Sequence, residues 1–590
     1  MCGISGEFSF RTDGDPLEAV RTMTAQMAPR GPDAAGIHQQ SGIAFGHRRL
    51  RVIDLSERAQ QPMVDSGLGL AIVFNGTIYN YRDLRRELEQ RGYCFFSRGD
   101  TEVVLKAYHA WGASCVDRFN GMFAFAIWHR DETRLFLARD RLGIKPLYYN
   151  ATADRFRFAS TLPALLAAGG VDTDIDPVAL HRYMTFHAVV PAPRTLLKGV
   201  RKLEPGCTME IDSDGTARSS RYWSLSFQPA AEELRYSQDQ WEERLGDELQ
   251  RAVRRRLVAD VPVGVLLSDG LDSSLLVALL SQAGQDGLQT FSIGFEEVNG
   301  ETGNEFTYSD RVANHFGTDH HKIEVQSSGL LSCLDECVLA MSEPMVSHDC
   351  IGFYLLGQRV SRHVKVVQSG QGADEVFAGY RWYPPLMDAV DPVSAYAEVF
   401  FDRRHEEYER SVFPDYAGAD HSTHFVRENF ALPGAGSPID KALRLDTTVM
   451  LVDDPVKRVD NMTMAWGLEA RVPFLDHELV ELAARIPAHL KVNGGGKHIL
   501  KKLGRKLLPA EVIDRPKGYF PVPALKHFRG PYLEKARSIL DSPASINRRL
   551  WDPSYVALLL DDPDAHLTPL RGSKLWQIVL LEYWLQSHGI

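Results

Sequence analysis

The second residue of the chain is a cysteine, in the opening MCGISGEFSF. If Met1 is removed, Cys2 carries a thiol and an α-amine on one carbon framework. An α-amine with a pKa of roughly 8 can accept the thiol proton near neutral pH, so such a residue is a nucleophile with its own base. The opening is compatible with covalent catalysis at the N-terminus and equally with a Cys2 that is simply a buried residue of a first strand.

A second stretch suited to chemistry is VGVLLSDGLDSSLL, residues 263–276. It reads as an apolar strand, a short polar turn and the start of an apolar helix. Backbone N–H groups at a helix N-terminus, beside the hydroxyls of Ser273 and Ser274, form an anion site that the helix dipole strengthens. Because the turn holds no lysine, it is not a Walker A loop. The stretch predicts a phosphate site of another kind.

Two kinds of elements must position these residues. Strand-like runs recur over about the first 200 residues, as in GLAIVFNG, GMFAFAIWHR, TRLFLARD and RFRFAS, and predict packed β-sheets with helices outside. Further along, apolar and helical runs alternate, which predicts a parallel sheet flanked by helices, with ligands at the carboxyl ends of its strands. We expect two domains, residues 1–205 and 206–590, joined through the turn-rich residues 191–206.

The composition limits the class of protein. A chain of 590 residues exceeds what one core supports, which agrees with two domains. The net charge of −11 argues against a nucleic-acid partner. We find no apolar run of membrane-spanning length and no secretory signal, so we expect a cytoplasmic protein without a membrane partner. The seven cysteines lack paired spacing, so disulfides or a cysteine zinc cluster are not expected.

The motifs of the first part resemble one family. MCGISGE, RGPD, GHRRLRVIDLS, NGTIYNY, GDTEV and ARDRLGIKPLYY occur in this order, as in the N-terminal-nucleophile (Ntn) glutaminase domain of class II glutamine amidotransferases, an α+β sandwich of sheets. The resemblance implies that Cys2 attacks the glutamine amide, and that Asn75 and the N–H of Gly76 stabilise the oxyanion. It also implies that Arg49 holds the glutamine carboxylate and that Asp100 faces the ammonium group.

One residue departs from this pattern. The family usually reads N-G-E-I-Y-N, with an acid that helps to hold the ammonium, whereas this chain has Thr77. A hydroxyl accepts a hydrogen bond but brings no charge. We therefore expect weaker glutamine binding than in relatives that have the acid, or a larger share of the contact for Asp100.

The polar turn of residues 268–274 resembles the PP-loop of ATP pyrophosphatases, usually S-G-G-x-D-S. The resemblance implies an α/β domain of the adenine nucleotide α-hydrolase type that cradles the pyrophosphate released from ATP. Downstream, VVQSGQGADEVFAGY resembles the second family segment and places Asp374 to share Mg²⁺ with Asp272. The ATP and pyrophosphate site implied in this way comprises Leu267, Ser268, Asp269, Gly270, Leu271, Asp272, Ser273, Ser274, Ser292, Ile293, Ser369 and Gly370.

Asp269 stands where the PP-loop usually has glycine. We expect this position to need a positive φ, which aspartate tolerates better than most residues. Its N–H can then point at phosphate while its carboxylate points away or joins the magnesium ligands. The alternative is a disabled site, because a carboxylate facing phosphate is repelled. We favour the tolerated variant because the rest of the motif is intact.

Matches over the remaining chain extend the resemblance to the asparagine synthetase family. They are RVDNMTMAWGLEARVPFLDHELVE at 458–481, GGGKHILKK at 494–502 and DRPKGYFPVP at 514–523. In this family a lysine neutralises charge on the adenylate and its pyrophosphate, which implies that role for Lys497. The family often has glutamate where this chain has Gln371, so we expect a changed acceptor substrate or a changed proton route.

Together these features predict a glutamine-dependent ligase with ATP as co-substrate and Mg²⁺ as cofactor. Glutamine is hydrolysed at Cys2, ammonia passes internally, and a carboxylate activated as acyl-AMP is captured as an amide. Internal passage follows from chemistry, because free ammonia is mostly ammonium at neutral pH. Homodimers are implied by the resemblance alone.

The acceptor acid stays open at this point. Thr77, Gln371, residues 342–356 and the tail LTPLRGSKLWQ are most similar to the N-acetylglutaminylglutamine amidotransferase branch, which amidates a blocked dipeptide to make a compatible solute. The alternatives are asparagine synthetase acting on aspartate, a glutaminase with a degenerate second domain, and a non-catalytic binding protein.

Overall fold

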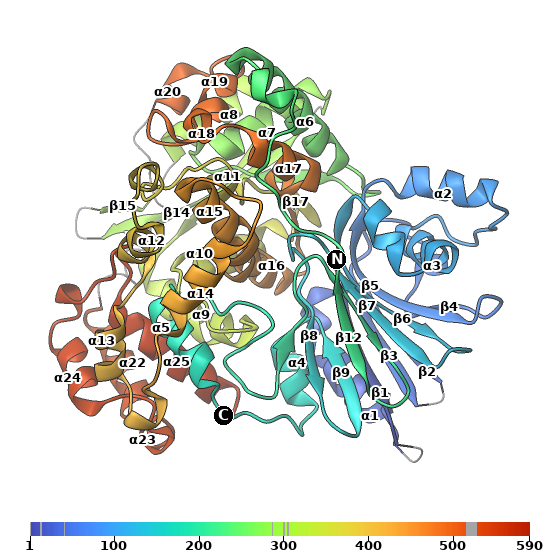
Figure 1. Cartoon of the computed structure of the whole chain (residues 1–590), viewed down its shortest axis with the longest axis horizontal. Helices are drawn as coiled ribbons and strands as arrows, with labels where there is room; N and C mark the ends of the chain where they lie inside the picture. The colour runs from blue at the N-terminus through green and yellow to red at the C-terminus, as the bar shows by residue number, and fades with distance from the viewer. Residues whose placement is uncertain are drawn as a thin grey trace.

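The computed structural model describes residues 2–11, 14–40, 42–285, 287–298, 301–303, 306–514 and 528–590. Figure 1 shows a β-rich N-terminal part, in blue to teal, beside a larger and mostly helical C-terminal part. Among the described residues, no helix is long and apolar enough to cross a membrane. DRPKGYFPVP, one of the segments that carried the resemblance, lies outside the described residues except for Asp514.

Two antiparallel sheets form the N-terminal part, where the strand-like runs predict packed β-sheets. The first has the order β10 (Arg201–Lys202), β8 (Tyr148–Ala151), β9 (Arg155–Ala159), β1 (Gly3–Ser9), β3 (Ile43–Arg49), β2 (Ala34–Gln40). The second has the order β12 (Ala217–Arg221), β11 (Cys207–Ile211), β7 (Arg134–Arg139), β6 (Gly121–His129), β5 (Leu70–Ile78), β4 (Met63–Asp65).

Apolar side chains of both sheets meet in one core, with Phe8 and Phe45 from the first sheet and Val73 and Leu137 from the second. Helices cover the outer faces. α1 (Leu17–Gln26) and α4 (Leu162–Ala167) pack on the first sheet, and α2 (Tyr81–Gln90) and α3 (Asp100–Trp111) pack on the second. Sheet residues contribute to the layers on both sides because successive side chains point to opposite faces.

The predicted boundary at residues 205 and 206 falls inside this sandwich. β11 pairs with β7 and with β12, so the second sheet continues to Arg221. The prediction was wrong because the turn-rich residues before 206 connect two strands of the same domain and do not separate two domains.

The C-terminal part contains the predicted parallel sheet, with the order β15 (Glu301–Gly303), β14 (Gln289–Val298), β13 (Val263–Leu266), β17 (Val366–Gln368), β18 (Glu469–Arg471). β16 (Asp319–Val325) pairs with β14, and every pair in this sheet is parallel except that of β14 with β15. α6 (Gln238–Arg255), α7 (Leu271–Gln282), α8 (Phe306–Phe316) and α10 (Asp349–Val360) alternate with these strands or flank them. The chain therefore turns from β13 into α7 at the predicted phosphate turn.

The remaining helices surround this sheet and reach across to the sandwich (Figure 1). They are α5 (Pro177–Thr185), α9 (Ser327–Ala340), α11 (Ala373–Val376), α12 (Pro392–Phe400), α13 (His405–Ser411), α14 (His421–Ala431), α15 (Pro438–Leu445), α16 (Lys457–Met464), α17 (His477–Arg485), α18 (Ala488–Val492), α19 (His498–Gly504), α20 (Ala510–Ile513), α22 (Pro531–Leu540), α23 (Pro543–Arg548), α24 (Pro553–Asp561) and α25 (Lys574–Ser587).

Buried ion pairs join the two parts. Asp460 on α16 receives Arg30 Nη2 at 2.9 Å and Lys145 Nζ at 3.0 Å, and all three side chains are buried. Burial alone would raise the pKa of Asp460, but these two cations hold it below its usual value. Removing one partner of such a pair leaves an uncompensated buried charge, which typically costs about 3–5 kcal/mol. The two parts are therefore packed as one unit.

Candidate active sites

The N-terminal cysteine lies in a small cavity between the two parts. Cys2 directly precedes β1 and shares the cavity with Arg49, Gly76 and Asp100, all predicted for one site. Cys2 is 7% exposed, and burial raises the pKa of its thiol. A neutral buried thiol needs a base at hand before it can attack a substrate.

Asn75 provides a hydrogen-bond donor beside the thiol. The N–H of Cys2 donates to Asn75 Oδ1 at 3.0 Å, and this bond determines which way the amide of Asn75 faces. Asn75 Nδ2 is buried and has no hydrogen-bond partner among the described residues. An unsatisfied buried donor costs about 1–3 kcal/mol. A negatively charged oxygen formed next to Cys2 would satisfy it.

Gly76 follows Asn75 in β5, where the strand runs close to β6. A Cβ atom at Gly76 would lie 2.3 Å from the carbonyl oxygen of Met122, so a side chain here would push the two strands apart. Because Gly76 has no side chain, its own backbone lines the cavity next to Asn75.

Arg49 is held by backbone carbonyls. Its Nη1 donates to the carbonyl of Ser56 at 2.9 Å, and its Nη2 donates to the carbonyl of Asp54. Asp54 has a φ of 50°, so this loop curves tightly around the guanidinium. Burial lowers the pKa of Arg49, although the group stays a cation at neutral pH. A fixed planar cation of this kind suits a carboxylate ligand.

Asp100 begins α3, and its Oδ2 accepts a hydrogen bond from the N–H of Ile78 at 3.0 Å. Burial raises the pKa of Asp100 to about 6. The carboxylate is therefore charged at neutral pH and becomes neutral in mild acid. A cavity lined by both the Asp100 carboxylate and the Arg49 guanidinium suits a ligand that has an ammonium group and a carboxylate.

Glu469 also lines this cavity, and sequence reasoning missed it. It belongs to β18 of the C-terminal sheet, and its Oε1 accepts a hydrogen bond from Thr77 Oγ1 at 3.5 Å. Arg471 Nε donates to the same carboxylate at 2.6 Å. Burial favours the neutral acid, but the positive charges around Glu469, Arg471 among them, lower its pKa to about 2. Nothing in the sequence relates positions 392 residues apart.

A second cavity, of about 750 Å³, opens at the carboxyl ends of β13 and β17. Nearly all residues of the predicted ATP and pyrophosphate site line it, namely Leu267, Ser268, Asp269, Gly270, Leu271, Asp272, Ser273, Ser292, Ile293, Ser369 and Gly370. Gln371, Asp374 and Lys497 line it as well. Ser274 does not line it, because it is fully buried and its hydroxyl donates to the carbonyl of Gly270 at 2.8 Å.

Two serines shape the phosphate turn. The hydroxyls of Ser268 and Ser273 are 3.0 Å apart, and the N–H of Gly270 donates to Ser268 Oγ at 3.1 Å. Gly270 caps α7, so the first N–H groups of the helix face this end of the cavity. The turn therefore has the donors and the dipole direction that an anion requires.

The expectation of a positive φ at Asp269 was wrong. Asp269 does not have a positive φ, and Gly270 has a φ of −78°. The turn enters the helix through ordinary backbone conformations, so glycine is not needed there for conformational reasons. Asp269 is 5% exposed and lines the cavity. Any effect of this residue on a bound anion therefore comes from the charge of its carboxylate and not from its backbone conformation.

Lys497 joins the two carboxylates predicted to bind magnesium. Its Nζ lies 2.6 Å from Asp272 Oδ2 and 2.9 Å from Asp374 Oδ1. Burial would lower the pKa of Lys497, but the two carboxylates raise it above its usual value. A Cβ at Gly379 would lie 2.1 Å from Asp374 Oδ1 and 2.3 Å from Lys497 Cε, so this glycine makes room for the cluster.

Further polar residues of this cavity were not predicted. The Tyr380 hydroxyl donates to Glu375 Oε1 at 2.6 Å, and burial raises the pKa of Glu375 to about 7. Lys501 and Arg505 also line the cavity. Lys501 and Arg505 follow Lys497 at successive steps of four residues. This spacing is a sequence signal that could have found them, because residues four apart share one helix face.

Comparisons with known proteins cover both parts. Residues 244–586 match the family described as "Asparagine synthase", and residues 1–223 match the "Glutamine amidotransferase domain". Asparagine synthetase [glutamine-hydrolyzing] 1 of Bacillus subtilis (strain 168) is 31% identical, over 99% of this chain and 96% of that protein. Asparagine synthetase B [glutamine-hydrolyzing] of Escherichia coli (strain K12) is 29% identical, over 88% of this chain and 82% of that protein.

A more distant relative is the amidase chry2 of Gibberella zeae, which is 26% identical over 92% of each chain. Among solved structures, glutamine phosphoribosylpyrophosphate amidotransferase from B. subtilis aligns with a TM-score of 0.31 at 15% identity. That alignment covers 56% of this chain and 92% of the other.

Proposed function

The chain belongs to the asparagine synthase family, and from this premise we propose that it hydrolyses glutamine at Cys2 and uses the ammonia to amidate an ATP-activated carboxylate. Membership makes it a carbon–nitrogen ligase with glutamine and ATP as substrates. The roles of individual residues and the identity of the acceptor acid are our proposals.

The buried and unpartnered Asn75 Nδ2 beside Cys2 carries the glutaminase half of this proposal. Once Met1 is removed, the α-amine of Cys2 accepts the thiol proton, and the sulfur attacks the amide carbon of glutamine. Asn75 Nδ2 and the N–H of Gly76 then stabilise the oxyanion, each worth roughly 3 kcal/mol in comparable sites. The α-ammonium returns its proton to the amide nitrogen, which leaves as ammonia, and water hydrolyses the thioester to glutamate.

We predict a pH dependence from Asp100, which we assign to the ammonium of glutamine. Its carboxylate is charged above a pKa of about 6 and neutral below it. Below pH 6 the value of kcat/KM for glutamine should therefore fall by a further factor of about ten per pH unit, beyond the decline that protonation of the Cys2 α-amine causes, because the free enzyme loses the charge that binds the ammonium. The profile is measured as glutamate release.

The variant Asp100→Asn is the matched test of that assignment. It should have a low kcat/KM for glutamine, and below pH 6 it should keep the decline from the α-amine but lack the further decline from Asp100. The ammonia-dependent reaction of the unchanged chain, with its rate divided by the concentration of unprotonated ammonia, should also lack the further decline. A decline of equal size in Asp100→Asn would assign the titration to another group.

We further propose that Glu469 replaces the acid that the family has at position 77. Glu469 remains charged, and its carboxylate is 3.5 Å from the hydroxyl of Thr77, in the same cavity as Asp100. We predict that Glu469→Gln raises KM for glutamine by about tenfold, the equivalent of one charge contact. Steady-state glutaminase kinetics measure this.

The chain offers a rescue for this variant. Adding Thr77→Glu to Glu469→Gln restores a carboxylate at the same spot and should return KM for glutamine toward its original value. Because Arg471 loses its charged partner in Glu469→Gln, thermal unfolding is measured in parallel. An unchanged KM in a folded Glu469→Gln protein would contradict the role.

For the ligase half, we propose that ATP binds in the 750 Å³ cavity with its phosphates at residues 268–273. The carboxylates of Asp272 and Asp374 both contact Lys497 Nζ, so they lie close enough to share one cation, and carboxylate oxygens suit Mg²⁺. Magnesium, when bound there, neutralises phosphate charge. Lys497 then contributes a second positive charge next to the leaving pyrophosphate.

We also propose that ammonia passes internally beside α16. Arg30 Nε donates to the carbonyl of Cys2 at 3.4 Å and Arg30 Nη2 pairs with Asp460 of α16, while α16 packs on α10, which lines the ATP cavity. With ¹⁵N-amide glutamine and excess unlabelled ammonium, the product amide should stay mostly ¹⁵N. Full dilution of the label would refute internal passage.

We propose N-acetylglutaminylglutamine as the acceptor acid, which would place the product among compatible solutes. Support comes from Gln371, a neutral amide lining the cavity where the family often has glutamate. A neutral side chain at this position suits a blocked dipeptide better than aspartate, which brings a free ammonium group. Aspartate is the second candidate, because the similar relatives are named asparagine synthetases.

The deciding experiment supplies ATP, magnesium and glutamine and follows pyrophosphate release with N-acetylglutaminylglutamine, aspartate or no acid. Release with the blocked dipeptide, with an amide product by mass, supports the proposal. Release with aspartate alone makes the chain an asparagine synthetase. Glutamate formation without pyrophosphate release for any acid would indicate a glutaminase with an inactive second half.

A further inference from the structure

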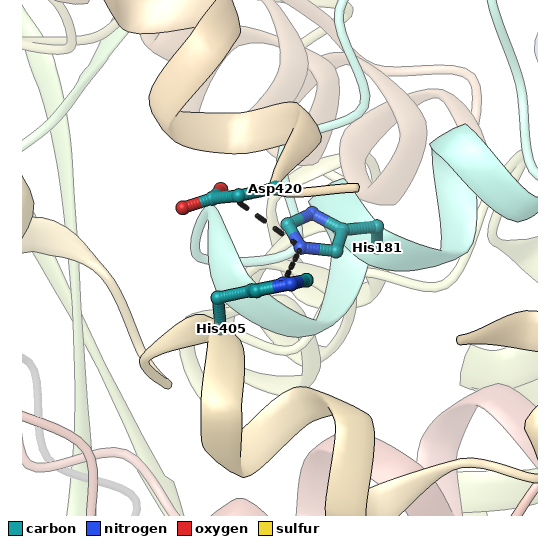
Figure 2. Close-up of side chains that lie close together, drawn as sticks. All are labelled: His181, His405 and Asp420. Carbon is teal, nitrogen blue, oxygen red and sulfur yellow. Dashed lines mark hydrogen bonds and ion pairs between the residues drawn. The ribbon is translucent and has the colours of Figure 1, made fainter. Parts of the chain in front are cut away.

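Two histidines and an aspartate meet far from both cavities. Figure 2 shows the ring of His181 between Asp420 and His405, each from a different segment of the chain. His181 Nε2 lies 3.2 Å from His405 Nδ1 and 4.0 Å from Asp420 Oδ1. One ligand atom from each of the three residues lies within 4.8 Å of the others. Nothing in the proposed reaction uses these side chains.

We propose that His181, His405 and Asp420 bind a divalent metal ion of the zinc class and so connect α5 to α13 and α14. Imidazole nitrogen and carboxylate oxygen are zinc ligands, at bond lengths near 2.0–2.1 Å. Two nitrogens on such an ion at a tetrahedral angle are about 3.3 Å apart. The nitrogens of His181 and His405 already have this separation.

The hydrogen bonds around His181 Nδ1 indicate which ring nitrogen carries the proton and which has the lone pair. The hydroxyl of Thr185 donates to the carbonyl of His181 at 2.7 Å, and the hydroxyl of Ser422 lies 2.7 Å from Thr185 Oγ1, to which it can donate. Both hydroxyl oxygens lie 3.3 Å from His181 Nδ1. With both hydroxyl protons used in this way, Nδ1 carries the ring proton, and the lone pair of Nε2 is directed at His405.

His405 and Asp420 are held in a matching way. Glu409 Oε1, one helical turn along α13, lies 3.7 Å from His405 Nε2, so it favours a proton on that nitrogen and leaves Nδ1 for a metal. A metal-bound histidine usually has such a partner on its other nitrogen. Asp420 caps α14, and its Oδ1 accepts from the N–H of Thr423 at 3.0 Å, which holds the carboxylate beside His181.

The site combines one buried ligand with two that are reached from solvent. His181 is almost fully buried, so packing holds its ring beside His405 and Asp420. His405 and Asp420 are partly exposed, with side-chain exposures of 22% and 35%. An ion can therefore enter from the side of these two residues.

A second group of possible metal ligands differs because its charges are already neutralised. Glu248, Asp476 and Glu478 also approach one another, but Arg251, Arg255 and Arg256 pair with them. Those carboxylates are neutralised by side chains of the protein. Around His181 the nitrogen donors are imidazoles, which select zinc over magnesium, so the Mg²⁺ needed for ATP would not fill the site.

Zinc binding to the full-length protein tests the proposal. After treatment with a chelator and removal of the chelator, isothermal titration with Zn²⁺ should show one tightly bound ion per chain, and excess Mg²⁺ should not displace it. Co²⁺ should give the visible absorption of a four-coordinate complex. Saturating Zn²⁺ should raise the melting temperature by a few °C, on the order expected for a ligand of the native state alone.

The variants His405→Ala and Asp420→Asn should lose this binding and the thermal shift, while glutaminase and ligase activities persist. Asparagine keeps an oxygen that can cap α14, so Asp420→Asn should still fold. His424→Ala is the matched control, since His424 is an exposed residue of α14 that pairs with Glu428. Zinc uptake that is absent, or that is unchanged in both variants, would overturn the proposal.

Discussion

Cys2→Ala should abolish glutamine-dependent synthesis and leave ammonia-dependent synthesis intact. Without the thiol, no thioester forms, and loss of a nucleophile costs about a thousandfold or more in rate. The Asn75 amide and the N–H of Gly76 have no role with exogenous ammonia. Amide product measured with glutamine, and separately with ammonium chloride, gives both rates.

Cys94→Ala is the matched control, because Cys94 is exposed and lies outside both cavities. It should change neither rate. The intact mass of the unchanged chain should also show that Met1 is absent, since only a free α-amine can serve as the base. Full glutaminase activity in Cys2→Ala, or in a chain that retains Met1, would contradict the mechanism.

Lys497→Met should lower pyrophosphate release by about a hundredfold or more, while glutaminase activity persists. The change removes a positive charge that lies between Asp272 and Asp374, so these carboxylates repel each other and the phosphates more strongly. Removing one preorganised charge contact to a transition state typically costs this much. Pyrophosphate release at saturating glutamine and acceptor acid measures the effect.

Lys506→Met provides the control, because Lys506 is an exposed residue that pairs with Glu242. It should release pyrophosphate at the original rate. Retained glutaminase activity in Lys497→Met shows that the protein is folded. A rate within about threefold of the original would show that the charge of Lys497 does not serve the reaction.

Much of the fold followed from local patterns. The alternating strands around Phe74 and Phe125 predicted a sandwich, and the run from Val263 to Leu276 predicted a strand, a turn and a helix. These patterns are reliable because the side-chain periods of strands and helices differ. The domain boundary failed because strand pairing between residues 134–139 and 207–211 is a long-range choice that local turn signals do not report.

Sequence by itself determined the family and was enough to propose Cys2 as nucleophile and residues 268–274 as a phosphate turn, since each signal is a short run of residues. Tertiary structure alone decided that Glu469 faces Thr77 and that His181 meets His405. It also showed that Asp269 keeps an ordinary φ. Such contacts join residues hundreds of positions apart, and they depend on how sheets and helices pack, which no local spacing records.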